Sequence, residues 1–416
     1  MDKKRLFLWS LYDFANSIVL IIFYIYFSQW LTIERGVSDF WYNFIFTASS
    51  ILLLLTAPVA ASIADKRKIK MPGLRITTIL TFLFFFITGV IVAFYPTHTI
   101  LTMIFATLAM YVYLFSFTYY HPLMYDVANS EKQGLASGWG IFGNELGQIV
   151  GLLLAIPLAT GTIVLFNASP RAQTLLPSAI LFFILSLPML LFFKEKGVKQ
   201  NVKVDIKQEY KGVVKSVIEM FKLPGLGRFF LAYFFFNDAI ITASNNFAIY
   251  LDRVFKVNDT IKSLVLVGII LVGAIGAPIG GWLSDKVGWK KTLMWLLAGW
   301  VIIFPVLALL TNFYAFLVVV VAMGIWWGAI WSVTRAIVMD LTPQTDLNQS
   351  FTFYTLMERF STLVGPISWG VIVVFVSQTN GLNYRVAIAS MTVFILIGFY
   401  IARKLPDKKM IRVGKN

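Results

Sequence analysis

The chain of 416 residues contains no cysteine and only two histidines, His98 and His121. Without cysteine there is no disulfide and no thiolate metal site, and two histidines cannot build a histidine-rich metal centre. The sequence also lacks a phosphate-binding Walker loop and a Ser-His-Asp grouping. These absences argue against an enzyme, a metal-binding protein and a self-contained ATP-driven pump. We therefore expect no cofactor and no metal.

Charge is also scarce, because only 13% of the residues are charged while 58% are hydrophobic. A soluble protein has about a quarter of its residues charged. Runs long enough to cross a hydrocarbon layer of about 30 Å recur along the chain, and they are too long for outer-membrane strands. The sequence predicts an all-α polytopic membrane protein with twelve transmembrane helices. The predicted spans are 6–31, 41–64, 74–95, 99–121, 134–159, 175–193, 228–251, 261–284, 291–311, 313–340, 350–377 and 383–404.

The basic residues gather on one side of the predicted membrane. With both termini inside, 27 of the 35 Lys and Arg residues lie in cytoplasmic stretches and 6 lie outside. This bias predicts cytoplasmic termini, and it explains the net charge of +15 without nucleic acid. The short loops are typical of a bacterial or archaeal inner membrane. The expected partners are a small-molecule substrate and the lipid bilayer, and we expect a monomer.

A long basic stretch divides the spans six and six. We predict an N-terminal six-helix bundle over 1–193, a cytoplasmic linker over 194–227, a C-terminal six-helix bundle over 228–404 and a basic tail over 405–416. From Ile206 to Phe221, apolar residues recur at helical spacing with lysines between them. This pattern predicts an amphipathic helix on the inner membrane surface, or else a linker with a charged surface.

The two halves of the sequence repeat each other. Ala57-Pro58 recurs as Ala277-Pro278 at an offset of 220. Polar membrane residues recur in the same order, at offsets that shorten gradually. These pairs are Tyr12 with Tyr233, Asn16 with Asn237, His121 with Arg335, Asp126 with Asp340, Ser137 with Ser350, and Glu145 with Glu358. Two halves of like orientation predict a pseudo-two-fold axis along the membrane normal.

Gly281 to Lys291 matches the pattern G-x-L-x-D-[RK]-x-G-x-[RK]-[RK]. This loop resembles the one between helices eight and nine of the major facilitator superfamily. The first-half copy keeps Asp65-Lys66 but has Ala61 and Lys68 where the glycines belong. The resemblance implies a transporter of two six-helix bundles, in which Asp65 and Asp285 stabilise the outward-open state.

Trp9 and Tyr12 to Ser17 form the pattern W-x-x-Y-D-F-A-N-S. This opening resembles that of the vacuole-effluxer-like (autophagy-related amino-acid effluxer) branch of the superfamily. Arg335, the stretch 341–343 and the stretch 351–366 resemble the same branch. The resemblance implies amino-acid efflux.

Polar residues on the first and seventh helices are candidates for substrate binding. Asp13, Asn16 and Ser17 lie at i, i+3 and i+4 and share a helix face. On the seventh helix the candidates are Asn237, Asp238 and Asn245. Each either binds substrate or an ion near the midplane, or forms an interhelical hydrogen bond. Asp13 begins near the inner end of its helix, so we predict a gating role for it.

Three carboxylates are candidates for proton coupling: Glu145, Asp238 and Glu358. Glu145 lies near mid-membrane with Asn144 and Gln148 beside it. The alternative is a fixed pair between Glu145 and an arginine. On the same helix, glycines four or five residues apart predict close helix packing.

Trp327, Trp331 and Arg335 follow one another at i, i+4 and i+8. The two tryptophans are predicted to bind substrate. Arg335 either holds an anion with them or pairs with Asp340 or Asp126 at an inner gate. The predicted gate residues are Asp13, Asp65, Asp126, Asp285, Arg335 and Asp340.

The sequence predicts a secondary transporter that works by alternating access and is coupled to protons. Its predicted substrate is a small polar solute, an amino acid or a related zwitterion. One alternative is export of amphipathic drugs or lipid-like compounds. Another is a non-transporting receptor or scaffold on the same fold.

Overall fold

The computed structural model describes residues 2–128, 133–197, 200, 205–222, 225–341, 353–354, 357–358 and 361–406. Within these ranges all regular structure is helical. The chain forms two compact units, one of Met1–Val213 with Asp259–Ser263 and one of Val214–Asn258 with Leu264–Asn416. The boundary predicted for the linker, 194–227, stays a prediction. Ser350, which the sequence repeat pairs with Ser137, lies outside the described residues.

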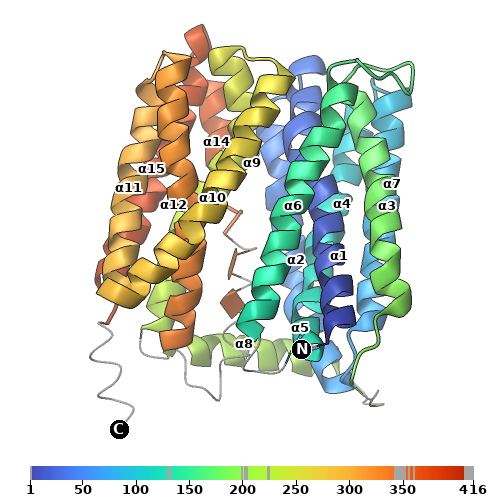
Figure 1. Cartoon of the computed structure of the whole chain (residues 1–416), viewed down its shortest axis with the longest axis vertical. Helices are drawn as coiled ribbons and strands as arrows, with labels where there is room; N and C mark the ends of the chain where they lie inside the picture. The colour runs from blue at the N-terminus through green and yellow to red at the C-terminus, as the bar shows by residue number, and fades with distance from the viewer. Residues whose placement is uncertain are drawn as a thin grey trace. The chain divides into compact units, whose positions relative to one another are not determined.

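The first unit is built from α1 to α7 and the start of α8 (Figure 1). Helix α1 packs against α6 and α7, α3 packs against α4 and α7, and α2 packs against α4. The helices are α1 Lys3–Ile22, α2 Asp39–Arg67, α3 Met71–Phe94, α4 Thr99–Tyr120, α5 Met124–Val127, α6 Gln133–Ala159, α7 Ala172–Phe192 and α8 Ile206–Lys222.

The second unit is built from the later helices. Helix α15 packs against α9, α11 and α14, and α11 packs against α12. The helices are α9 Leu226–Tyr250, α10 Asp259–Val287, α11 Trp289–Leu309, α12 Phe313–Leu341, α14 Gly365–Phe375 and α15 Leu382–Arg403.

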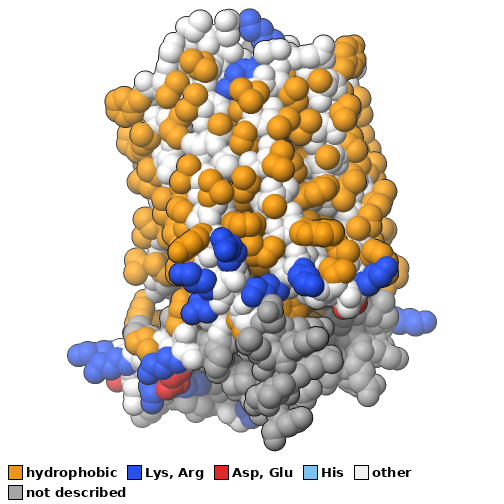
Figure 2. Space-filling model, turned by 90° about the vertical axis from the view of Figure 1, so that its left-hand side faces the viewer, with side chains coloured by type: hydrophobic (Ala, Val, Ile, Leu, Met, Phe, Trp, Pro, Cys, Tyr) orange, Lys and Arg blue, Asp and Glu red, His pale blue; other side chains and the backbone are white. Residues whose placement is uncertain are grey.

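Eleven described helices are long and apolar enough to cross a membrane, and Gly365–Phe375 is a shorter apolar helix. They account for the twelve predicted spans, and the predicted all-α membrane fold is confirmed. Figure 2 shows an apolar surface, with Lys and Arg along the lower edge of the apolar region. Trp295, Ile302, Val318 and Phe375 are among the exposed apolar residues of the second unit. Such a surface is suited to contact with lipid chains rather than water.

The first and sixth helices of the first unit approach each other closely along a line of glycines. A Cβ atom at Gly143 would lie 2.7 Å from the carbonyl oxygen of Ser10, and one at Gly147 would meet the carbonyl oxygen of Phe14. A Cβ at Gly151 would lie 3.1 Å from the Cα of Ile18. Glycine is needed here because no side chain fits between the two backbones.

The sequence repeat has a counterpart in the helices. Helices α2 and α10 are both 29 residues long, and they begin at Asp39 and Asp259. Both contain an internal proline, Pro58 or Pro278. Each half also contains a π-helical turn at an equivalent place, Trp30–Glu34 and Leu251–Phe255, an offset of 221. The first half has another π-helical turn at Phe23–Phe27, directly after α1. The two halves therefore share local backbone geometry as well as sequence.

The predicted continuous span over 350–377 is wrong in its middle. A non-helical stretch, Ser361–Val364, precedes α14, which begins at Gly365. Pro366 lies in the first turn of α14, where its missing backbone N–H costs nothing, because the first N–H groups of a helix have no partner within the helix. The segment therefore contains a break beside α9, which contacts α14.

Helix α8 runs across the spans at the end of the first unit that carries the N-terminus (Figure 1). Glu209 is buried against the C-terminal end of α2, where its carboxylate accepts a hydrogen bond from Ser62 (2.5 Å) and pairs with Lys66. Tyr210 donates a hydrogen bond to the carbonyl of Leu55. The helix is thus docked on the first unit through specific polar contacts.

Candidate functional site

A chain of polar side chains joins α1 and α6 in the first unit. Asp13 is 9% exposed and Asn16 is fully buried on α1. The amide of Asn144 on α6 donates to Asp13 Oδ1 over 3.4 Å, and Gln148 Nε2 donates to Asn144 Oδ1 over 2.8 Å. The structure brings together residues that the sequence placed on two separate helices.

Two members of this polar cluster have atoms without a hydrogen-bond partner. Neither the amide nitrogen nor the carbonyl oxygen of Asn16 has a partner among the described atoms, and the same holds for Glu145 Oε2. No described Lys or Arg forms an ion pair with Glu145. Leaving a buried polar group unsatisfied costs about 1–3 kcal/mol. The cluster, here defined as Asp13, Asn16, Asn144, Glu145 and Gln148, is therefore a candidate binding site.

Aromatic contacts fix the orientation of α1 beside this polar cluster. The Tyr120 hydroxyl on α4 donates to the carbonyl of Trp9 over 2.8 Å, and the two rings stack at 5.0 Å. The Tyr12 hydroxyl lies 2.7 Å from that of Thr78 on α3. Ser17, predicted to bind substrate, donates to the carbonyl of Asp13 over 2.9 Å. Its bond therefore lies within its own helix.

In the second unit, adjacent residues of α9 hold the break that precedes α14. Asp238 is fully buried, and its Oδ2 accepts from the backbone N–H of Gly365 over 2.7 Å. Asn237 donates to Ser361 and to the carbonyl of Glu358 (3.2 Å). A carboxylate at a helix N-terminus is favourable because the free N–H groups carry partial positive charge. Substrate binding by Asn237 and Asp238 stays a prediction, and both have these structural bonds.

The predicted aromatic pair lies together on α12. Trp327 and Trp331 are half-buried, with ring centroids 6.3 Å apart and planes at 87°. Arg335 is half-buried one turn further on and has no recorded ion pair among the described residues. Asn245 is buried on α9. The roles predicted for these residues, and for Glu358, stay predictions.

The predicted gate residues have different surroundings. Asp65 is exposed and pairs with Lys70 at 3.4 Å. Asp126 Oδ1 accepts from the backbone N–H of Lys196 over 3.1 Å, in the segment after α7. Asp285 is exposed at the end of α10, and Asp340 is half-buried at the end of α12. Their gating roles stay predictions.

The sequence reasoning did not single out a charged cluster at the opposite end of the first unit. Arg171 binds Asp259 through two bonds, Nε to Oδ2 (2.8 Å) and Nη2 to Oδ1 (3.1 Å). Lys262 is fully buried, pairs with Asp259 at 2.7 Å and donates to Gln29. The signal was present, because Asp259 repeats Asp39 at the same offset of 220 as the proline pair.

Comparison with known sequences places relatives across nearly the whole chain. The sequence model of the Major Facilitator Superfamily matches residues 229–415. The uncharacterized MFS-type transporter YxiO of Bacillus subtilis (strain 168) is 21% identical over 430 residues, which cover 98% of this chain and 96% of YxiO.

Solved structures share the fold. A bacterial homolog of the human lysosomal transporter Spinster superposes with a TM-score of 0.75 at 13% identity, covering 96% of this chain and 97% of the other. The nucleoside transporter NupG gives a TM-score of 0.69 at 14% identity, covering 97% of this chain and all of NupG. At such identities the likeness establishes the twelve-helix fold alone.

Proposed function

We propose that this chain moves a small polar solute across a membrane by alternating access. Its fold and its family match support a secondary transporter of the major facilitator superfamily. The solute we infer is an amino acid or a related zwitterion. Because Trp9 and Tyr12 to Ser17 resemble the efflux branch, the proposal includes transport of the solute out of the cell.

The unsatisfied groups of the polar cluster carry this proposal. A zwitterion presents an ammonium and a carboxylate close together. Glu145, which has no ion pair among the described residues, suits the ammonium or a proton, and the amide of Asn16 suits either end of the solute. A polar side chain in a span is costly unless it has a function.

Glu145 is also the proposed site of proton coupling. A carboxylate that alternates between binding a proton and binding the cationic group of the solute couples proton movement to solute movement. Replacing Glu145 by Gln keeps the shape and removes the charge. Glu145→Gln is expected to abolish uptake driven by a pH gradient in proteoliposomes, and an unchanged pH dependence of uptake would contradict the coupling role. Glu219→Gln, on the exposed face of α8, is the matched control.

A nucleoside or another ring-bearing solute is the second candidate. The observation that favours it is the half-buried pair Trp327 and Trp331, whose rings could stack on a base or sugar. The nucleoside transporter NupG shares the fold. Trp327→Ala would then abolish counterflow of nucleosides, whereas Asn16→Ala would have little effect on it.

Counterflow of labelled solutes into proteoliposomes tests these proposals directly. The panel contains amino acids, nucleosides, sugars and a lipophilic dye. Exchange of amino acids that is lost in Asn16→Ala supports the main proposal. Exchange of nucleosides alone supports the second candidate, and dye movement alone supports drug export. No exchange of any solute by a folded protein contradicts the transport proposal.

A further inference from the structure

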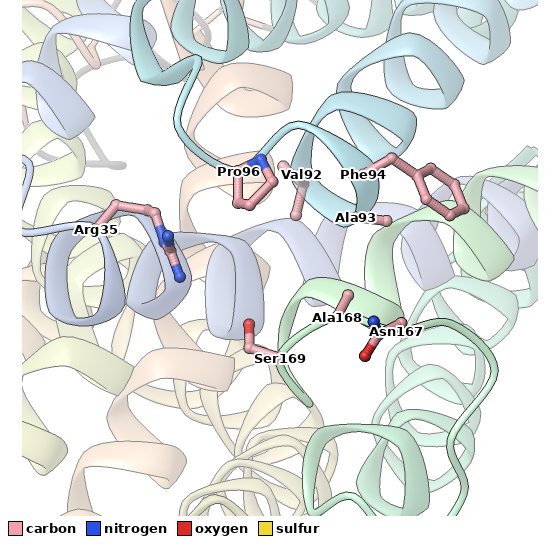
Figure 3. A pocket seen from close by; sticks show the side chains of 8 residues that line it. All are labelled: Arg35, Val92, Ala93, Phe94, Pro96, Asn167, Ala168 and Ser169. Carbon is pink, nitrogen blue, oxygen red and sulfur yellow. The ribbon is translucent and has the colours of Figure 1, made fainter.

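The end of the first unit opposite the N-terminus holds a cavity of about 620 Å³ (Figure 3). Arg35 lines one side of it. The end of α3 lines another through Val92 to Phe94, and the connection between α6 and α7 supplies Asn167 to Ser169. Arg35 follows Asn16 by 19 residues, so it lies roughly 28 Å further along the first helix at 1.5 Å per residue. The cavity is therefore separate from the polar cluster.

Arg35 is the one ionised side chain among the eight residues that line the cavity. Its Nε is buried and has no hydrogen-bond partner among the described atoms. Its guanidinium lies 5.7 Å from the ring centre of Trp30, close enough for a cation–π contact that holds it in place. The neighbouring Glu34 is occupied by Ser169 (2.5 Å) and Arg171 (3.5 Å). The cavity thus offers a positioned cation and lacks an anion.

The loop that supplies Asn167 to Ser169 to the cavity is held by contacts on its N-terminal side. Gln173 is 1% exposed, and its Oε1 accepts from the backbone N–H groups of Leu165 (2.6 Å) and Phe166 (3.1 Å). The ring of Phe166 packs edge-on against Phe94 at 5.3 Å. These contacts fix the shape of the cavity, so an occupant meets a preformed site.

Apolar residues next to the lining residues in the sequence are uncovered. Phe94, which lines the cavity, and Tyr95, Ile163, Val164 and Leu165 are between 47% and 68% exposed. They lie beside the ends of α3 and α6, where a membrane-spanning helix meets the lipid headgroups. A site with a guanidinium inside and apolar side chains at its edge matches a molecule with an anionic head and a hydrocarbon tail.

We propose that this cavity binds the phosphate of an anionic membrane lipid, with the guanidinium of Arg35 as its principal partner. An arginine matches phosphate because its N–H groups can bind two oxygens at once. The amide of Asn167 lines the same cavity and supplies a further donor. The bound lipid stabilises the first unit without entering the transport route.

The test measures lipid-dependent stabilisation of the delipidated full-length protein. Thermal midpoints and apparent affinities are compared in phosphatidylcholine with and without added phosphatidylglycerol, for the unaltered chain, Arg35→Gln and Ala168→Trp. Lys256→Gln is the control, because it removes one exposed basic residue that does not line the cavity. Phosphatidylglycerol is expected to raise the midpoint of the unaltered chain and of Lys256→Gln. Its apparent affinity should fall at least tenfold in Arg35→Gln and in Ala168→Trp, which fills the cavity.

Two outcomes would overturn the proposal. If Arg35→Gln and Ala168→Trp respond to phosphatidylglycerol as the unaltered chain does, the cavity is not the site. If inorganic phosphate or glycerol phosphate at equal concentration gives the same stabilisation, the ligand is a free anion and the lipid assignment is wrong. Should Arg35→Gln fail to fold, Ala168→Trp decides the question, since it keeps the charge.

Discussion

Asn16 is fully buried on α1, and its amide makes no hydrogen bond with the described residues. Asn43 on α2 is equally buried, but its Nδ2 donates to the carbonyl of Asp39 over 2.9 Å. The second asparagine therefore has a hydrogen bond to lose, and the first has none among the described residues. This contrast separates a polar group kept for binding from one kept for packing.

We predict opposite effects for alanine at these two positions. Asn16→Ala should leave the thermal midpoint unchanged or raise it, because no bond is lost, and should abolish substrate exchange. Asn43→Ala should lower stability by about 1 kcal/mol through the lost hydrogen bond and leave exchange in place. Thermal unfolding and counterflow on the same samples measure both. A large loss of stability in Asn16→Ala would show that the residue is structural.

Gly365 has no room for a side chain. A Cβ atom there would lie 2.6 Å from Asp238 Oδ1 and would also meet Thr242. We predict that Gly365→Ala costs about 1–3 kcal/mol, the usual cost of overpacking. Gly212→Ala on α8 is the control, since nothing lies within 4 Å of a Cβ there, and it should stabilise by up to about 1 kcal/mol. Thermal unfolding in one detergent compares the two, and equal midpoints would contradict the close contact.

The sequence pointed to Asn16 and Glu145, because polar residues inside apolar spans are conspicuous, and their roles stay predictions. It was not sufficient to find the bond between Asp238 and Gly365, which are 127 positions apart. The partner of Asp238 depends on how α9 packs against the break before α14. Residue type alone suggested a substrate contact, whereas the packing adds a helix-capping role.

At the scale of the helices, α8 is docked on α2 through Glu209 and Tyr210, and Glu209 supplies the charged contact. The Lys66 ammonium and the Ser62 hydroxyl beside Glu209 hold the pKa of that carboxyl below its usual value. A carboxyl with a lowered pKa stabilises the contact fully when the pH is above the ordinary glutamate pKa of about 4.3. The contribution is lost only as the pH falls through the lower, docked value.

We predict that Glu209→Gln loosens α8 from α2 at neutral pH. The distribution of distances between spin labels on Gly212→Cys and Arg67→Cys should broaden, and its mean should increase. The reason is that a neutral amide cannot form the ion pair with Lys66. In the unaltered chain the same change should appear only under acid conditions, below about pH 4.3.

Glu219→Gln provides the control on the same helix. Glu219 pairs with Lys215 at 3.8 Å and both are exposed, so the pair contributes at most about 0.5 kcal/mol. Its label distances should match those of the unaltered chain. Equal broadening in both variants would mean that helix charge, and not the contact of Glu209, holds α8 in place.

The helices themselves were largely predictable from hydrophobic runs, and their interruptions were not. The glycine spacing on α6 predicted close packing, and the contacts of Gly143 and Gly147 with α1 confirm it. The break at Ser361–Val364 was missed because Gly365-Pro366 lies inside an apolar run that reads as one span. The π-helical turns gave no signal, since their residues are as apolar as the helix around them.

At the scale of the whole molecule, orientation in the membrane rests on the distribution of basic residues. We predict that Lys207 lies on the cytoplasmic side and Thr97 on the other. The chain has no cysteine, so Lys207→Cys and Thr97→Cys each provide a single labelling site. In intact cells an impermeant maleimide should label Thr97→Cys only. Labelling of Lys207→Cys instead would invert the predicted topology.

The twelve-span fold followed from composition, and the sequence repeat predicted two similar halves. The substrate did not follow, because it depends on a few polar atoms whose positions are set by packing. Arg171 and Asp259 illustrate the limit: they are 88 positions apart in the sequence, and only the structure shows them joined.

The π-helical turns at Trp30–Glu34 and Leu251–Phe255 bear on the history of the protein. A π turn arises when one residue is inserted into an α-helix, and such turns are rare. Their offset of 221 residues is also the one that relates Tyr12 to Tyr233. The π turn at Phe23–Phe27 has no such counterpart, because the matching stretch of the second half, 244–248, lies inside α9. The two halves have therefore kept one interruption of the helix in common and differ in the other.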